Sequence, residues 1–253
     1  MKILVFGTKS YDRESFEKEL ADYPDLKVDF TETNLTPLTA TLAQGYEAVC
    51  AFVNADVSAM TLEVLRGLGV GLVLMRCAGF DAVNVDFAKQ VGMRVTRVPA
   101  YSPEAIAEHA MALALAANRR ICKGYNRVRE NNFSLTGLVG ETLHGKTAGI
   151  VGTGRIGAAL CRICKGFGMT VVAYDPYPDR RYAAEAGITY VSLDELYSRA
   201  DIISLHCPLT DRTRYMIGDV AISHMKPGVI LINTGRGQLI HTEALIDGLK
   251  EKK

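Results

Sequence analysis

Three glycines form the clearest chemical motif of the chain. The stretch TAGIVGTGRIGAALC places Gly152, Gly154 and Gly157 directly after a strand-like apolar run and at the start of a helical pattern. In a strand–turn–helix unit the first glycine permits the tight turn, the second lets the backbone approach a pyrophosphate, and the third lets helix and strand pack closely. Helix N-terminal N–H groups attract anions, so the motif predicts a phosphate site, although such turns also occur without ligands.

An acidic residue supports a dinucleotide interpretation of this motif. The next strand pattern, TVVAY, ends in Asp175, eighteen residues after Gly157, where a carboxylate accepts hydrogen bonds from an adenosine ribose. An acid at this position repels a 2′-phosphate, which favours NAD over NADP as the cofactor. Arg180 and Arg181 follow closely in the sequence and leave NADP open.

Two later strand patterns end in residues that can contact a ligand. ADIISLHCPLT ends in His206, Cys207 and Pro208, with Thr213 in the turn that follows. GVILINTG ends in Thr234 and Gly235 and presents Arg236. Residues at the carboxyl ends of parallel strands face the ligand crevice, so His206 can line the nicotinamide site, act as an acid, or only shape the loop. Arg236 can hold a carboxylate and polarise a carbonyl oxygen, or it can bond loop carbonyls.

Two segments of the first hundred residues are further candidates. RCAGFDAVNVD places Ala78 and Gly79 after a strand pattern, where backbone N–H groups can cradle an anion or simply form a turn. Tyr101, in VPAYSPE, stands at a junction between two patterned regions and can either offer its hydroxyl to a substrate or pack.

Apolar strand patterns and amphipathic helix patterns alternate along the chain and must position these residues. The alternation runs from Lys2 to about residue 100 and begins afresh at Lys146, after a polar stretch. At the junction, Ser102 can cap a helix whose first position is Pro103, and this alanine-rich helix is apolar on nearly every side, so we expect it to be buried. The order predicts an α/β protein with two doubly wound parallel-sheet domains, residues 1–100 and 101–253.

The composition narrows the class of protein further. Of 253 residues 48% are hydrophobic, and 29 Lys and Arg nearly balance 28 Asp and Glu, which argues against binding to nucleic acid or an anionic membrane. The first apolar run is too short for a signal peptide or a membrane span, and six scattered cysteines suit reduced thiols, so we expect a cytoplasmic protein without a metal site. Cys161 and Cys164 share a helical pattern and are expected to face a core.

The chain resembles the D-2-hydroxyacid dehydrogenases over its whole length. Six motifs occur in the order and spacing of that family: RCAGFDAVNVD, RVPAYSPEAIAEHA, NFSLTGLVGETLHGKTAGIVGTGRIG, GFGMTVVAYDPYP, ISLHCPLT and LINTGRG. The AYSPE segment is typical of the bacterial fermentative D-lactate dehydrogenase branch. The resemblance implies a flavodoxin-like substrate domain around an inserted Rossmann domain that binds NAD, with the active site in the cleft between them, reduction of pyruvate to D-lactate, and a homo-oligomer, which we expect to be a dimer.

The resemblance also implies roles for individual residues. Arg236 binds and polarises pyruvate, backbone groups of Ala78 and Gly79 hold its carboxylate, and Tyr101 contacts it. The cofactor contacts that it implies are Arg155, Ile156, Asp175, Cys207, Pro208, Thr213, Thr234, Gly235 and Arg236. Together with Gly152, Gly154, Gly157 and His206, which the motif and the strand end indicate, they make up the expected cofactor site.

The chain departs from the family pattern at its end. Family members continue past the stretch ALIDGLKEKK with a further strand, an aspartate at the nicotinamide, a glutamate, a proton-donating histidine and a long returning helix. The resemblance therefore implies that the chain is C-terminally truncated and turns over poorly alone. Two alternatives stay open: an NAD-binding homologue without catalysis, and a chain completed by a partner.

Overall fold

The computed structural model describes residues 1–253, which form two compact units, Met1–Tyr101 and Ser102–Lys253. The division falls one residue after the boundary expected from the sequence. Each unit contains one five-stranded sheet in which all strand pairs are parallel. The expected fold class, two parallel-sheet α/β units, is confirmed.

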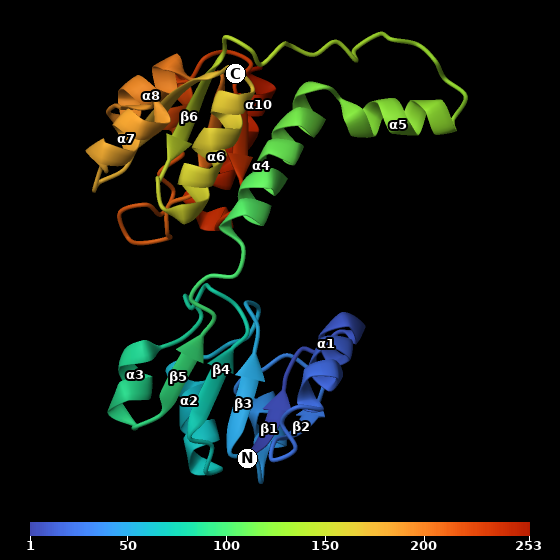
Figure 1. Ribbon diagram of the computed structural model, residues 1–253, viewed down its shortest axis with the longest axis vertical. Coiled ribbons are helices and arrows are strands. Elements are labelled where there is room, and N and C mark those ends of the chain that lie inside the picture. Colours follow the sequence, from blue (N-terminus) through green and yellow to red (C-terminus); the bar gives the residue numbers. More distant parts are fainter. The chain divides into compact units, whose positions relative to one another are not determined.

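The first unit has the strand order β2-β1-β3-β4-β5 (Figure 1). Its elements are β1 (Lys2–Val5), α1 (Ser10–Leu20), β2 (Lys27–Phe30), η1 (Thr39–Ala43), β3 (Ala48–Ala51), α2 (Ala59–Gly67), β4 (Leu72–Met75), α3 (Val85–Gln90) and β5 (Arg94–Arg97). Alternate side chains of β1 enter different cores: Leu4 packs in the cluster that contains α2 residues, and Ile3 and Val5 pack in the cluster that Phe16 of α1 joins. Helices therefore lie on both faces of this sheet, as the continuous apolar strands predicted.

The second unit has the strand order β10-β9-β6-β7-β8. Its elements are α4 (Pro103–Asn118), α5 (Ile121–Arg129), β6 (Thr147–Val151), α6 (Arg155–Gly166), β7 (Thr170–Tyr174), α7 (Arg180–Ala186), β8 (Thr189–Tyr190), α8 (Leu193–Arg199), β9 (Ile202–Leu205), α9 (Asp219–His224), β10 (Ile230–Asn233), η2 (Gly237–Leu239) and α10 (Thr242–Lys250). The chain proceeds from β6 to one side through β7 and β8 and returns to the other side with β9 and β10. Strand order thus reverses beside β6, which is where doubly wound sheets bind ligands.

Two cores cover the two faces of the second sheet. Residues of α4 and α6 pack together in one cluster, and residues of α8 and α9 pack in the other. Cys161 and Cys164 both lie in the α4–α6 core, where burial raises the pKa of their thiols to about 11 and about 12. The expectation that these two residues face a core is confirmed.

Helix α4 differs from the sequence-based expectation. Its cap is as predicted, because Ser102 Oγ accepts a hydrogen bond from the N–H of Ala105 and Pro103 occupies the first turn. The expectation that the helix is buried was wrong for part of its surface: one stripe is buried, whereas Glu108, His109 and Leu113 are exposed. An apolar composition does not determine how many faces of a helix are covered, because covering depends on which elements pack against it.

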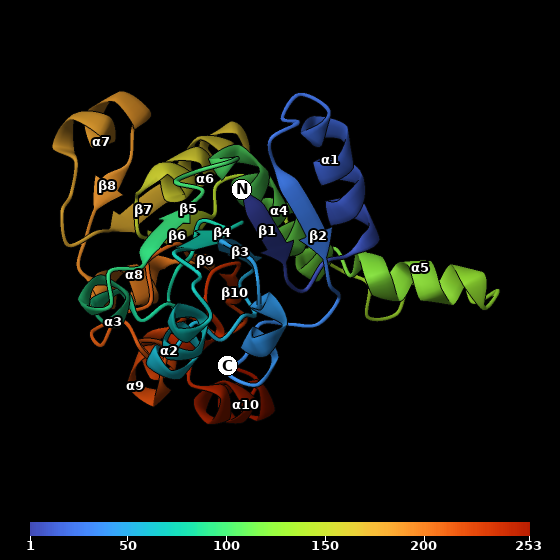
Figure 2. The ribbon, with the colours of Figure 1, turned by 90° about the horizontal axis from the view of Figure 1, so that it is seen from below.

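Helix α5 was not expected, since its sequence belongs to the polar stretch between the two patterned regions. The helix has no buried residue and projects from the second unit, as both views show (Figures 1 and 2). Arg127 holds the returning loop, because its Nη1 donates to the carbonyls of Ser134 at 3.0 Å and Thr136 at 2.7 Å. No helix in the structure is both long and apolar enough to cross a membrane.

Candidate active site

The three glycines in the turn between β6 and α6 differ in how much space the protein leaves for a side chain. Gly152 has φ +91°, and a Cβ there would lie 2.8 Å from the backbone N of Cys207. A Cβ on Gly157 would lie only 1.9 Å from the carbonyl oxygen of Gly152. Packing inside the protein therefore requires glycine at both positions. A Cβ on Gly154 would meet no protein atom within 4 Å, so packing inside the protein does not require glycine at this position.

The start of α6 is built to accept an anion. Gly154 is the N-cap residue, and no side chain caps the helix. Gly154 and Arg155 are exposed, and Ile156 is half-buried. The first N–H groups of a helix that lacks a capping side chain are available to an anionic ligand, and the helix dipole favours one.

Asp175, directly after β7, lies against this turn. Its Oδ2 accepts hydrogen bonds from the N–H of Thr153 at 2.8 Å and from the Thr153 hydroxyl at 3.1 Å. Its Oδ1 accepts one from the N–H of Tyr177 at 2.9 Å. The fold therefore brings the predicted ribose-binding acid next to the predicted phosphate turn, at the carboxyl ends of the neighbouring strands β6 and β7.

His206 follows β9, on the other side of β6. Its Nε2 lies 2.9 Å from the hydroxyl oxygen of Ser204. Burial disfavours the charged imidazolium and lowers the pKa of His206 to about 4. The ring is therefore neutral at neutral pH, which suits a wall of a cofactor site better than a proton donor.

The residues after His206 form an ordered turn. Thr213 Oγ1 donates to the carbonyl of Pro208 at 2.7 Å and accepts from the N–H of Thr210 at 2.8 Å. The backbone of Cys207 lies directly against Gly152, and burial raises the pKa of the Cys207 thiol. The thiol is therefore protonated and serves as part of the wall rather than as a nucleophile.

The turn after β10 is held by a residue that the sequence patterns did not single out. The side chain of Asn233 donates from Nδ2 to the carbonyl of Arg236 at 2.9 Å and accepts at Oδ1 from the N–H of Gly235 at 2.9 Å. An asparagine two residues before a glycine is a common turn signal and was the clue available in the sequence. The hydroxyl of Thr234 is buried without a hydrogen-bond partner, and Arg236 is half-buried.

Two arginines that the sequence patterns also missed lie near the candidate loop of the first unit, Ala78–Phe80, and one of them, Arg97, binds it. Arg76 donates to the carbonyls of Phe6 at 2.8 Å and Gly7 at 2.9 Å, which joins the ends of β4 and β1. Arg97 donates to the carbonyl of Ala78 at 2.9 Å and lies over the ring of Phe80. Tyr101, at the end of this unit, is 67% exposed. The chemistry of these arginines was visible in the sequence, but their partners were not.

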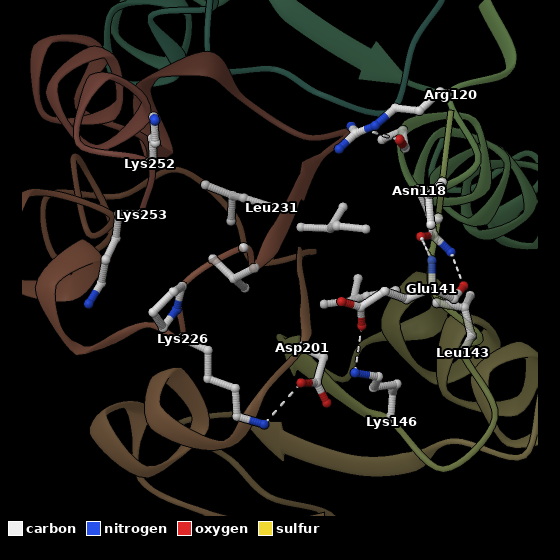
Figure 3. A pocket seen from close by; sticks show the side chains of 18 of the residues that line it. Asn118, Arg120, Glu141, Leu143, Lys146, Asp201, Lys226, Leu231, Lys252 and Lys253 are labelled. Atoms are coloured by element: carbon white, nitrogen blue, oxygen red, sulfur yellow. Dashed lines mark hydrogen bonds and ion pairs between the residues drawn. The ribbon is translucent and has the colours of Figure 1, made fainter. Parts of the chain in front are cut away.

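A cavity lies elsewhere in the second unit. It measures about 600 Å³ and is lined by none of the candidate residues. Its wall includes Ile202 and Ile230, the first residues of β9 and β10, and the ion pair between Lys226 and Asp201 (Figure 3). The amino ends of the strands therefore line this cavity, whereas the glycine turn, Asp175 and Arg236 follow the carboxyl ends.

The residues at the carboxyl ends fit a dinucleotide. An uncapped helix start, an open Gly154 position, a fixed carboxylate and an unpartnered Thr234 hydroxyl offer phosphate-, ribose- and hydroxyl-binding groups along one sheet edge. No group of three or more His, Cys, Asp and Glu residues that could hold a metal ion occurs in the structure.

Comparison with known proteins agrees with this geometry. Residues 111–253 match the family model "D-isomer specific 2-hydroxyacid dehydrogenase, NAD binding domain". The chain belongs to the D-isomer specific 2-hydroxyacid dehydrogenases, which are NAD-dependent oxidoreductases, and these residues are its NAD-binding domain.

Particular relatives place the chain near the D-lactate dehydrogenases. It is 48% identical to D-lactate dehydrogenase of Escherichia coli over 253 residues, all of this chain and 76% of that protein. The apo structure of D-lactate dehydrogenase from Escherichia coli matches with a TM-score of 0.92, over all of this chain and 79% of that one. A pyruvate reductase of Chlamydomonas reinhardtii matches with a TM-score of 0.91 at 43% identity, over all of this chain and 74% of that one. The chain thus spans about three quarters of the length of these relatives.

Proposed function

We propose that this chain binds NAD through the carboxyl ends of β6, β7, β9 and β10 and takes part in reducing pyruvate to D-lactate. The observation that supports this most directly is the open Gly154 position at the uncapped start of α6. Arg155 and Ile156 then contact the pyrophosphate, and Asp175 binds the adenosine ribose. His206, Cys207, Pro208, Thr213, Thr234 and Gly235 line the nicotinamide end.

The substrate contacts that we propose are one charged side chain, two backbone N–H groups and one hydroxyl. Arg236 binds the 2-oxo acid, since a guanidinium forms two parallel hydrogen bonds and stabilises negative charge that develops on the carbonyl oxygen. Backbone N–H groups of Ala78 and Gly79 hold the substrate carboxylate, and the hydroxyl of Tyr101 contacts the substrate. Bound NADH supplies the hydride. The similarity to a D-lactate dehydrogenase and to a pyruvate reductase supports this substrate class.

The proton for the developing alkoxide needs a separate donor. His206 is a poor one, because burial lowers its pKa to about 4 and the ring has no acidic proton at neutral pH. Since a positioned general acid contributes about 10²–10⁴ in rate, we propose that these residues oxidise NADH with pyruvate far more slowly than is ordinary for dehydrogenases. This same property of His206 favours the second candidate function, NAD binding without turnover.

Two measurements test these proposals. NADH fluorescence titration of the chain is expected to saturate, and absence of saturable binding would refute the cofactor site. Pyruvate-dependent NADH oxidation at rates ordinary for dehydrogenases would refute the proposal of slow turnover and would point to Tyr101 or His206 as the donor.

A variant tests the role of Arg236. Arg236→Gln is expected to leave the NADH dissociation constant within about threefold of wild type but to weaken binding of oxamate, an unreactive pyruvate isostere, to the NADH-loaded chain by about tenfold or more, since a charge-assisted hydrogen bond is lost. Arg162→Gln, an exposed arginine of α6, is the matched control. Equal oxamate affinity in both variants contradicts the assignment.

We also propose that the chain forms a homodimer through α5 and the loop that follows. Ile121, Tyr125 and Val128 lie at helical spacing on α5 and are all exposed, as are Phe133 and Leu135. Exposed apolar stripes of this kind mark association surfaces. Val128→Glu is expected to shift the mass measured by light scattering to that of the monomer, whereas Val220→Glu, a valine of α9 that is 70% exposed, is not. A wild-type monomer contradicts the proposal.

We propose the cytoplasm as the place of action. All six cysteines are free thiols, and thiols persist in a reducing compartment.

A further inference from the structure

Tyr190 is a polar residue of the second unit to which no role has been assigned. It ends β8, which lies beside β7 (Figure 2), and its backbone pairs with Ala173, two residues before Asp175. The side chain is half-buried, and its hydroxyl lies 2.7 Å from the hydroxyl oxygen of Thr153. The same hydroxyl oxygen accepts a hydrogen bond from the N–H of Asp179 at 3.3 Å.

The direction of this hydrogen-bond chain follows from counting protons. The Thr153 hydroxyl has one proton, which it donates to Oδ2 of Asp175, because an ionised carboxylate can only accept. Tyr190 must therefore donate its own proton to Thr153 Oγ1. The hydrogen-bond chain therefore leads from the N–H of Asp179 through the hydroxyls of Tyr190 and Thr153 to the carboxylate of Asp175.

This chain of hydrogen bonds holds the carboxylate of Asp175 from one side. Oδ2 accepts two hydrogen bonds from Thr153, and Oδ1 accepts one from Tyr177. A carboxylate has about four lone-pair sites, so capacity remains on Oδ1 for a ligand hydroxyl. The Asp179 contact also ties Tyr190 to the segment between Asp175 and the start of α7, where the exposed Arg180 lies.

We propose that Tyr190 is a positioning residue that makes Asp175 discriminate between NADH and NADPH. The inference rests on the proposed role of Asp175 at the ribose. A carboxylate fixed in place repels a 2′-phosphate, whereas a carboxylate held only by the backbone N–H groups of Thr153 and Tyr177 can shift and leave the phosphate to Arg180. Tyr190 acts through Thr153, and it limits this rotation without touching the cofactor.

Fluorescence titrations with NADH and NADPH measure the proposed effect without turnover. Tyr190→Phe keeps the ring and removes one hydroxyl, and we expect the ratio of the NADPH to the NADH dissociation constant to fall about tenfold, chiefly through tighter NADPH binding. Tyr182→Phe is the matched control, because Tyr182 is half-buried in the same unit and its hydroxyl donates to the carbonyl of Ala158 at 2.8 Å, outside the hydrogen-bond chain to Asp175. The control is expected to keep the wild-type ratio within about twofold.

Changes at Thr153 separate positioning from general damage. Thr153→Ser keeps a hydroxyl and is expected to retain the wild-type ratio, whereas Thr153→Ala removes the link and is expected to lower the ratio as Tyr190→Phe does. If Thr153→Ser and Thr153→Ala behave alike, the hydroxyl chain is not what holds Asp175, and the proposal is overturned.

Asp175→Ala distinguishes failure of this inference from failure of the proposed function. If that variant abolishes discrimination while Tyr190→Phe keeps the wild-type ratio, the role of Tyr190 is refuted and the ribose site stands. If Asp175→Ala also keeps the ratio, the ribose assignment and the inference both fail. A fall in the ratio for Asp175→Ala, Tyr190→Phe and Thr153→Ala, with no change for Tyr182→Phe, supports the proposal.

Discussion

Alanine substitutions in the glycine turn are expected to separate folding from cofactor binding. In Gly157→Ala the new Cβ would lie 1.9 Å from the carbonyl oxygen of Gly152, where real Cβ contacts stay above 3.0 Å. The clash is with backbone, so no flexible side chain can move aside, and α6 must shift by roughly 1 Å from β6. Overpacking of this kind costs about 1–3 kcal/mol, and we expect the upper end. For a chain of this size that corresponds to a fall of roughly 6–12 °C in the melting temperature.

Gly154→Ala is expected to behave in the opposite way. Its Cβ meets no protein atom within 4 Å, but alanine is a poorer N-cap residue than glycine by about 0.5–1 kcal/mol, so the melting temperature should fall by only about 1–4 °C. The same Cβ points into the space through which a pyrophosphate approaches the start of α6. We therefore expect NADH affinity to fall by about tenfold or more.

Gly166→Ala is the matched control for both variants. Gly166 is the last residue of the same helix, and a Cβ there also meets nothing within 4 Å. This variant should melt at or slightly above the wild-type temperature, since alanine favours helix over glycine by up to about 1 kcal/mol, and should bind NADH normally. Thermal unfolding by circular dichroism and NADH titration give the two readouts. The reasoning is refuted if Gly157→Ala melts within 2 °C of wild type, a margin set at roughly the shift from 1 kcal/mol, or if Gly154→Ala binds NADH as Gly166→Ala does.

Two further predictions concern stability as a function of pH. Burial by itself raises the pKa of Asp201, but hydrogen bonds from the Thr147 N–H and from Lys226, together with the charge of Lys226, lower this pKa overall. Asp201 therefore stabilises the fold at any pH above the ordinary pKa of aspartate. This contribution disappears as the pH falls through the lowered pKa of Asp201. Asp201→Asn should thus reduce the free energy of unfolding at pH 7 by about 1–2 kcal/mol and make little difference in strong acid, as urea titrations at several pH values can test; an equal deficit in strong acid contradicts this. Burial lowers the pKa of His206 to about 4. Between about pH 6.5 and 4 the unfolded chain therefore binds a proton that the folded chain does not, so the free energy of unfolding should fall as the pH is lowered across that range. His206→Gln should flatten that fall, and an unchanged slope would show that His206 is not the group responsible.

Local sequence patterns were enough to predict the fold class. Strand and helix periodicity is set by neighbouring residues, so KILVF, TAGIV and TVVAY could be recognised as buried parallel strands, and the Ser102–Pro103 helix start could be recognised from its cap. The apolar residues of α5, Ile121, Tyr125 and Val128, recur at helical spacing, so the sequence did contain a helical signal, but it was missed because the segment is short and mostly polar. The sequence did not show that this apolar stripe stays exposed within the chain.

The candidate site, too, could be predicted from the sequence only in part. The spacing of Gly152, Gly154 and Gly157 and the position of Asp175 are local properties, and the sequence determined by itself that a phosphate turn is followed by an acid at the next strand end. It did not determine that packing requires Gly152 and Gly157 and leaves Gly154 open.

Only the tertiary structure decided how distant side chains act on these residues. Tyr190 reaches Thr153 because β8 pairs with β7 in one register, and Arg97 reaches Ala78 because β5 lies beside β4. The neutral state of His206 likewise depends on the elements that exclude water from it. Strand order, register and desolvation are properties of contacts between residues far apart in the chain, so a pattern of neighbouring residues does not contain them.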